Sequence, residues 1–288
     1  MHGCQTRIVD KGASDRDYRH GCRDFAGWTK AKQTRGQATE TQNTQHSGSH
    51  ETFAGRRSSA GQDIVFPFVA FVCVLFVVLT AAAMLVFPGG TKQDPASTGY
   101  HFFLNFFSDL GATTTRSGAD NLASMTLFMS ALVSVATTLT LFFLAFTRFF
   151  ADIPLLLSRI GAVFGFLAAI GFVGVAATPW DRLLGAHNAF VQLAFGAFFV
   201  AVMLNLAAIL RTPGFPRRFA WVFAIFGVLL FAYVLLIFFG PNPKLSDTGA
   251  AIQSTGQKII VYASIVTVFI QSLGVVSLRS HHGMRADR

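Results

Sequence analysis

Polar and apolar positions divide the chain into one polar N-terminal stretch and six long apolar runs. The runs extend over residues 64–88, 122–147, 155–177, 187–210, 219–240 and 257–278. Each run reaches about 20 residues, the length that a helix needs to cross roughly 30 Å of hydrocarbon. No run carries an acidic or basic residue near its middle. The pattern predicts an all-α fold, a polytopic six-helix transmembrane bundle.

Residues 1–63 differ from the rest of the chain. They are rich in Gly, Ser, Thr, Gln and Arg and show no sustained period, a composition typical of a disordered segment. No apolar region follows the start, so this stretch is not predicted to be a signal peptide. We therefore predict a disordered polar N-terminal extension over 1–63, a six-helix transmembrane domain over 64–280 and a short tail over 281–288.

Composition agrees with a membrane protein. Hydrophobic residues make up 52% of the chain and charged residues 13%, against about 25% charged in soluble domains. The net charge of +9 raises the possibility of nucleic-acid binding. However, the basic residues lie in the N-terminal extension and at the ends of the apolar runs, with no basic stripe interleaved with aromatics. We expect membrane lipids as partners and no nucleic acid, and a protein partner is not identifiable.

The distribution of Lys and Arg predicts an orientation. If residues 1–63 are cytoplasmic, the cytoplasmic flanks hold many arginines: Arg56, Arg57, Arg148, Arg159, Arg211, Arg217, Arg218, Arg279, Arg285 and Arg288. The opposite side holds fewer basic residues: Lys92, Arg116, Arg182, Lys244 and Lys258. By the positive-inside rule, we predict a multi-pass protein of the cytoplasmic membrane with both termini cytoplasmic.

Two patterns predict how the helices pack. Gly161 and Gly165 form a small-xxx-small pair in the third run, which lets helix backbones approach closely. Ser130, Ser134 and Thr137 form a mild polar stripe on the second run. We expect that stripe to make hydrogen bonds between helices rather than a transport path.

A first candidate segment follows the first apolar run. At helical spacing, His101, Asn105, Ser108 and Asp109 of "HFFLNFFSDLGA" fall on one face, and the phenylalanines and Leu110 on the other. This pattern predicts a short interfacial helix after the first span, ended by Gly111. Asp109 can also act only locally, as a cap or in an ion pair. Further on, Asp120 or Asn121 is placed to cap the second span.

Two further segments fall on the same predicted membrane side. In "ATPWDRLLGAHNAFVQ", Pro179 is placed to start a helix and Trp180 suits the interfacial aromatic belt. Lys258 opens the last run, where it can simply snorkel to the surface. The three segments together define a candidate extracytoplasmic polar cluster: His101, Asn105, Ser108, Asp109, Asp181, Arg182, His187, Asn188 and Lys258.

Metal and cofactor motifs are absent from the sequence. Cys4, Cys22 and Cys73 are too few for a disulfide framework, and with His2 and His20 they match no common ligand spacing. No phosphate-binding loop or haem attachment motif is present. We predict no metal and no cofactor.

The Ser108-Asp109-Leu110-Gly111 motif, together with Asp181 and His187-Asn188, resembles a bacterial and archaeal family of six-helix membrane proteins that is known only as a domain of unknown function. The resemblance covers roughly residues 64–280. It extends, more distantly, to the eukaryotic DRAM/Sfk-like membrane proteins, which are associated with membrane lipid and autophagy regulation. It implies the six-helix topology and marks these positions, without implying a reaction.

Three classes of function remain. We favour a non-enzymatic membrane protein whose polar cluster binds lipid headgroups or a partner. The alternative is a membrane-embedded lipid hydrolase, which is similar only distantly to zinc-dependent ceramidases. For that role, His101 and His187 lack a third histidine, since His281 and His282 lie in the tail, and a catalytic zinc normally has three protein ligands. A transporter ranks third. Carriers usually place ionisable residues near the middle of the membrane, and the apolar runs carry none there.

Overall fold

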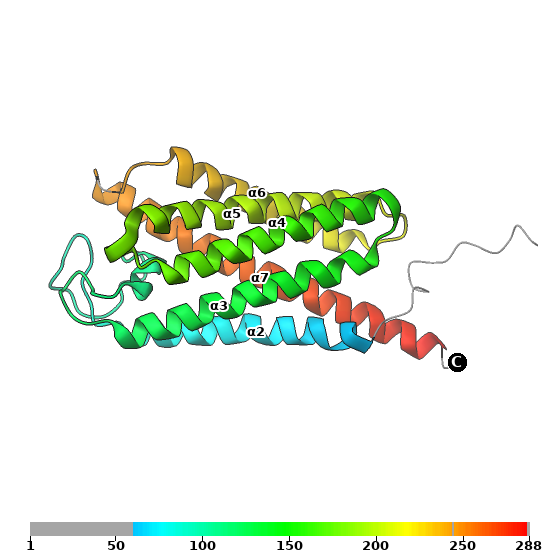
Figure 1. Ribbon diagram of the computed structural model, residues 1–288, viewed down its shortest axis with the longest axis horizontal. Helices are drawn as coiled ribbons and strands as arrows, with labels where there is room; N and C mark the ends of the chain where they lie inside the picture. The colour runs from blue at the N-terminus through cyan, green and yellow to red at the C-terminus, as the bar shows by residue number, and fades with distance from the viewer. Residues whose placement is uncertain (1–59, 244, 287–288) are drawn as a thin grey trace, which may run out of the picture. The chain divides into compact units, whose positions relative to one another are not determined.

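The computed structural model describes residues 60–243 and 245–286. These residues form six long helices: α2 (Ala60–Leu85), α3 (Leu122–Phe146), α4 (Asp152–Ala177), α5 (Trp180–Leu210), α6 (Arg217–Phe239) and α7 (Asp247–Ala286) (Figure 1). Two short 3-10 helices, η2 (Phe107–Gly111) and η3 (Thr147–Phe149), complete the described structure. The predicted extension over 1–63 lies almost wholly outside the described residues.

All six long helices are long and apolar enough to cross a membrane, so the predicted six-helix bundle is confirmed. Each helix packs against the next one along the chain, and α7 also packs against α2. The helices therefore close into a ring. Their connections alternate between the two ends of the bundle, and the long loop before α3 lies at the same end as the α4–α5 and α6–α7 connections (Figure 1).

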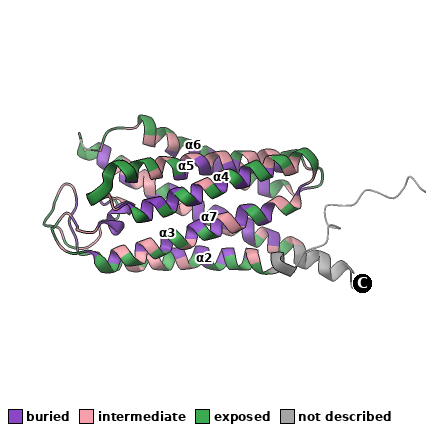
Figure 2. Cartoon of the chain, in the orientation of Figure 1, coloured by how far each residue is buried: buried purple, intermediate pink, exposed green. Residues whose placement is uncertain are grey.

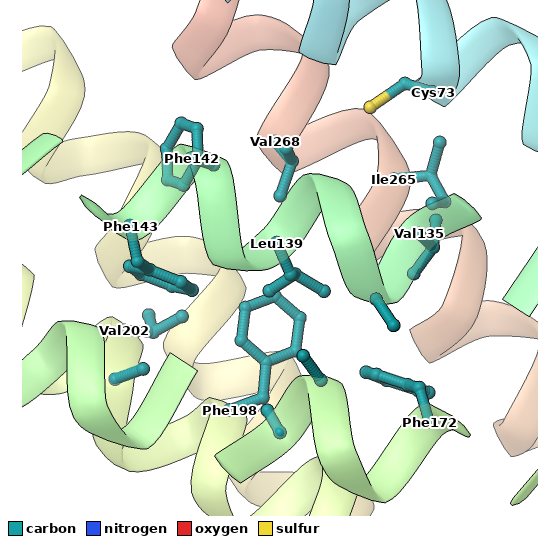
Figure 3. Close-up of a cluster of buried hydrophobic side chains, with 14 of the residues drawn as sticks. Cys73, Val135, Leu139, Phe142, Phe143, Phe172, Phe198, Val202, Ile265 and Val268 are labelled. Atoms are coloured by element: carbon teal, nitrogen blue, oxygen red, sulfur yellow. The ribbon is translucent and has the colours of Figure 1, made fainter. Parts of the chain in front are cut away.

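Apolar side chains fill the inside of the ring and also cover its outside. Buried and exposed residues alternate along each helix (Figure 2). Phenylalanines such as Phe142, Phe143 and Phe198 make edge-to-face contacts in the interior (Figure 3). Ile225 and Val228 on α6 are 63% and 69% exposed. Exposed apolar side chains along a whole helix indicate a surface that faces lipid rather than water.

Glycines of α4 allow close packing, but the predicted pair faces two different helices: Gly161 faces α5, whereas Gly165 faces Phe143 of α3. A Cβ at Gly161 would lie 2.5 Å from Nδ2 of Asn205, and a Cβ at Gly171 would lie 2.6 Å from the backbone nitrogen of Ala194. The prediction for the polar stripe on α3 is wrong. Ser130 and Ser134 donate to carbonyl oxygens four residues back in their own helix, because that acceptor is always within reach in a helix.

Two helices begin earlier than the apolar pattern predicts. Helix α5 begins at Trp180, directly after Pro179, which the sequence places at a helix start but which precedes the apolar run. Helix α7 begins at Asp247 rather than near residue 257. The added turns contain polar residues, which hydrogen-bond to the loop before α3. Those partners satisfy the polar groups, so the helices extend beyond their apolar parts.

The short helix after the first span is present, but it begins at Phe107 rather than at His101. Residues 102–105 form turns instead, because Oδ1 of Asn105 accepts from the backbone N–H of His101. The predicted apolar face is divided: Phe102 and Phe103 are exposed, whereas Phe107 and Leu110 are buried. The ring of Phe107 packs against Phe76, Phe128 and Tyr262, so η2 is part of the bundle.

Candidate functional site

Residues 86–121, which we call the cap, cover one end of the bundle (Figure 1). The cap folds back on itself at Gly90, whose φ of +91° suits glycine. A Cβ there would also lie 2.4 Å from the backbone nitrogen of Ser117, so only glycine fits. The carbonyl oxygen of Gly90 accepts from Nδ2 of Asn105 at 2.8 Å. Asn105, a residue of the candidate cluster, thus holds the two halves of the cap together.

Asp109 lies at the centre of the cap and is 3% exposed. Its Oδ2 accepts from the backbone N–H of Phe106 at 2.9 Å and from Nδ2 of Asn105 at 3.1 Å. Nη2 of Arg116 lies 3.8 Å from its Oδ1. Burial raises the pKa of this carboxyl above its ordinary value, although Arg116 and the two hydrogen bonds act in the opposite direction. Asp109 therefore acts locally, at the start of η2, as one of the two sequence interpretations proposes.

Lys258 ties α7 to the cap. It is 1% exposed, so the prediction that it snorkels to the surface is wrong. Its Nζ donates to the carbonyl oxygen of Asn105 and, at 3.0 Å, to that of Ser254. It also lies 5.4–5.7 Å from the ring centres of Phe102 and Tyr100. A buried lysine needs such partners, because burying an unpaired charge is costly.

The neighbouring turns of α7 make further bonds to the cap. The hydroxyl of Ser254 donates to the carbonyl oxygen of Phe103 at 2.8 Å. Oε1 of Gln257 accepts from the backbone N–H of Phe107 at 2.9 Å. Together with Lys258, these side chains satisfy main-chain groups of the cap that would otherwise be buried without partners.

Asp181 ties the start of α5 to the other side of the cap. Its carboxylate accepts from the backbone N–H groups of Thr113 and Thr114 at 3.0 and 3.2 Å, and from the hydroxyl of Thr113. Nε of Arg182 donates to the same hydroxyl at 3.0 Å and lies 3.6 Å from Asp181. The two charged residues therefore have defined partners in the cap.

Asn121 performs a role that differs from the predicted one. It occupies the N-cap position of α3 without making a side-chain capping bond. Its amide donates instead to the carbonyl oxygens of Leu110 and Ala112, at 3.1 and 2.9 Å. The buried carbonyl groups at the end of η2 need donors, and this amide supplies them. Oδ1 of Asn121, the atom that would accept a capping bond, makes no hydrogen bond to the described residues.

Arg116 is the residue of the site that sequence reasoning missed. Its guanidinium lies 4.5 Å from the ring centre of Trp180 and also next to Asp109. One arginine thus connects the centre of the cap to the first residue of α5. In the sequence, Arg116 contributes only to the charge distribution, and Trp180 only to the aromatic belt. No local pattern indicates that the two residues meet.

His187, Asn188 and His101 lie apart from these contacts. His187 is buried, with Nδ1 2.7 Å from the carbonyl oxygen of Thr178, which links α5 to the end of α4. Asn188 and His101 are exposed. Within residues 60–243 and 245–286, no hydrogen bond or ion pair joins His187 to Asp109 or to Ser108, which is buried in η2. The predicted sharing of one site by Asp109 and His187 therefore stays a prediction.

The described residues also bear on metal binding. Among them, no three His, Cys, Asp or Glu residues lie close enough together to hold a metal ion. Cys73 is buried with a free thiol, and Cys4 and Cys22 lie outside the described residues.

Comparisons with known proteins found no matching family model, no matching curated protein and no matching solved structure. The fold itself defines the class: the chain is a multi-pass membrane protein with six apolar helices and a folded polar cap over one end of its bundle.

Proposed function

We propose that the protein is a non-enzymatic lipid-binding protein of the cytoplasmic membrane, with both termini cytoplasmic and the cap on the extracytoplasmic side. The cap would take the phosphate of an anionic lipid headgroup between Arg116 and Arg182. The distant resemblance to the DRAM/Sfk-like membrane proteins belongs to the same proposal, since those proteins are associated with membrane lipid regulation.

The observation that carries this proposal is a layering of charge. At the junction of the cap and α5, the two acidic side chains are covered and the two basic ones face outward. The side chain of Asp109 is 4% exposed and that of Asp181 13%, whereas those of Arg116 and Arg182 are 27% and 67% exposed. An approaching ligand therefore meets guanidinium groups, whose planar donors suit phosphate oxygens.

The position of this surface supports a lipid as the source of the phosphate. The guanidinium of Arg116 lies over the ring of Trp180, and tryptophan is enriched where membrane meets water. Phe102 and Phe103 of the same cap are 42% and 65% exposed. A cap that carries both exposed aromatic and exposed basic side chains is suited to contact with headgroups and the adjoining hydrocarbon.

The two alternatives have less support. A hydrolase needs a nucleophile with an adjacent base or a metal with three ligands, and Ser108 and His187 make no bond with each other. A transporter of ions or polar solutes needs polar groups that face a pathway. Nζ of Lys258 and Nδ1 of His187 are bonded to main-chain carbonyl oxygens, so both side chains have a structural partner within the fold.

Lipid titration of the purified full-length chain tests the proposal. Native mass spectrometry measures the binding of phosphatidylglycerol, which is anionic, and of phosphatidylcholine, which is zwitterionic. We expect preference for phosphatidylglycerol, and about tenfold or more weaker binding for R116Q and for R182Q, since a hydrogen bond to a charged group contributes roughly 1.5–3 kcal/mol.

Two matched variants serve as controls. R211Q removes an exposed arginine from the opposite end of the bundle and should leave binding unchanged. T113V removes the hydroxyl that Asp181 and Arg182 share, while keeping both arginines, and should weaken binding far less than R182Q. Equal binding of both lipids, or equal losses in R182Q and R211Q, would contradict the headgroup site.

The proposed orientation has a separate test. Ser117 is an exposed residue of the cap, and S117C can be labelled in a chain whose three natural cysteines are replaced. A membrane-impermeant maleimide added to intact cells should label S117C. Labelling only after the membrane is broken would contradict the proposed orientation. It would not bear on the headgroup site, which the lipid titration tests separately.

A further inference from the structure

A second feature lies inside the ring of helices. An apolar cavity of about 40 Å³ opens between α2, α3, α4, α5 and α7. Several of its lining side chains come from different helices and surround the same interior space (Figure 3): Cys73, Val135, Leu139, Phe172, Phe198 and Ile265. At roughly 10–15 Å³ for each water-sized sphere, the cavity has room for about three such spheres.

The lining offers almost no hydrogen bonds to an occupant. Its two hydroxyl residues are engaged elsewhere: Thr138 donates to the carbonyl oxygen of Ser134 at 2.6 Å, and Ser264 donates to that of Ile260 at 2.7 Å. The thiol of Cys73 is only a weak donor. A water molecule needs two to four polar partners, so this space suits neither water nor an ion.

The depth of the cavity in the membrane indicates which kind of molecule surrounds the protein there. Most of its lining residues lie near the middle of their helices, as Cys73 does in the span Ile64–Leu85 and Leu139 in the span Leu122–Phe149. The surrounding membrane at this depth consists of hydrocarbon chains. An empty space in a packed interior loses dispersion contacts, and an apolar chain restores them without needing hydrogen bonds.

We propose that this cavity holds the terminal, methyl-bearing segment of a membrane lipid's acyl chain. The small volume limits the occupant to a few carbon atoms, so the rest of the chain lies outside the cavity. This site is independent of the proposed headgroup site, because it involves other residues, another depth and another kind of contact.

A photoreactive phospholipid tests the proposal. The full-length chain is reconstituted with phosphatidylcholine that carries a diazirine near the end of one acyl chain, irradiated, digested and mapped by mass spectrometry. We expect adducts on lining residues such as Val135 and Leu139, in addition to those on lipid-facing residues. A second phospholipid with the diazirine near its carbonyl group should give at least tenfold fewer adducts on the lining. A free fatty acid with a terminal diazirine, used in parallel, shows whether the chain must come from a phospholipid.

Matched variants distinguish the cavity from the outer surface. V135F fills the cavity from α3, and S264L fills it from α7 if V135F does not fold. Either variant should remove most adducts from the other lining residues. V133F changes a lipid-facing residue two positions away, which is 47% exposed, and should not. Adducts confined to lipid-facing residues, or lining adducts that persist in both filled variants, would overturn the proposal.

Discussion

The cap end of the bundle and its middle are held together by different forces. At the cap, buried or half-buried polar side chains bind main-chain groups of a loop that has little regular structure: Asn105, Asp109, Asn121, Asp181 and Lys258 all do this. In the middle, glycines and phenylalanines fit by shape alone. The comparison shows that a polar residue near a membrane can have a structural task, which is why we place the proposed binding site on the outward-facing groups.

The largest effect is expected at Lys258. K258M removes the donor to the Asn105 and Ser254 carbonyl oxygens. Leaving buried acceptors unpaired should cost about 2–4 kcal/mol, which lowers the Tm by roughly 5–12 °C for a chain of this size. Thermal unfolding in detergent measures it. The matched control is K92M, because Lys92 forms a surface pair with Asp247, whose side chain is 74% exposed, and such pairs contribute little. Equal stability of K258M and K92M would contradict the claim that buried polar bonds hold the cap in place.

A smaller effect is expected in the middle of the bundle. In G171A, the new Cβ would lie 2.6–2.7 Å from backbone atoms of Ala194, so α4 and α5 must separate slightly. Overpacking of this kind costs about 1–3 kcal/mol. G196A is the control, because a Cβ there meets nothing within 4 Å, and it should leave the Tm unchanged or slightly raised. A Tm of G171A equal to that of the wild type would show that helix contact here does not depend on shape.

The D181N variant tests how strongly the carboxylate of Asp181 anchors the cap to α5. D181N keeps the size of the side chain but replaces an acceptor oxygen with a donor, and the N–H groups of Thr113 and Thr114 compete for what remains. We expect a loss of about 1–2 kcal/mol. Limited proteolysis should then cut residues 113–118 faster, while cutting at the opposite end of the bundle stays unchanged. D247N, at an exposed acid of α7, should alter neither, and a similar change in both variants would argue against a specific anchor.

The smallest effect concerns pH. Burial raises the folded-state pKa of Asp109 above its ordinary value of 3.8, so the folded protein binds this proton more readily than the unfolded chain. Lowering the pH from neutrality through the raised pKa should therefore stabilise the wild type relative to D109N. The Tm difference between the two proteins, measured from neutral pH down to the ordinary value of 3.8, should change in favour of the wild type. A difference that changes in favour of D109N would contradict the direction of the shift.

The sequence predicts the helices better than it predicts the cap. A run of about 20 apolar residues has few structures open to it in a membrane, and the six spans follow from that constraint. Asn105 and Asp109 were also found, because they share a helical face. Arg116 was not, since its contacts with Asp109 and Trp180 depend on how the cap folds in three dimensions. The roles of Lys258 and Asn121 were mistaken because their partners are main-chain carbonyl groups, which no residue pattern reveals.

Hydrogen–deuterium exchange of residues 86–121 tests the central claim most directly, that this loop is a folded cap and not a connector. The full-length chain is measured in nanodiscs of phosphatidylcholine, and again with phosphatidylglycerol. We expect the amides of Phe106, Phe107, Thr113 and Asn121, which are all hydrogen-bonded, to exchange slowly in both. Phosphatidylglycerol should slow exchange further around Thr113 and Arg116. Exchange of these amides as fast as that of an unstructured loop in phosphatidylcholine would contradict the account.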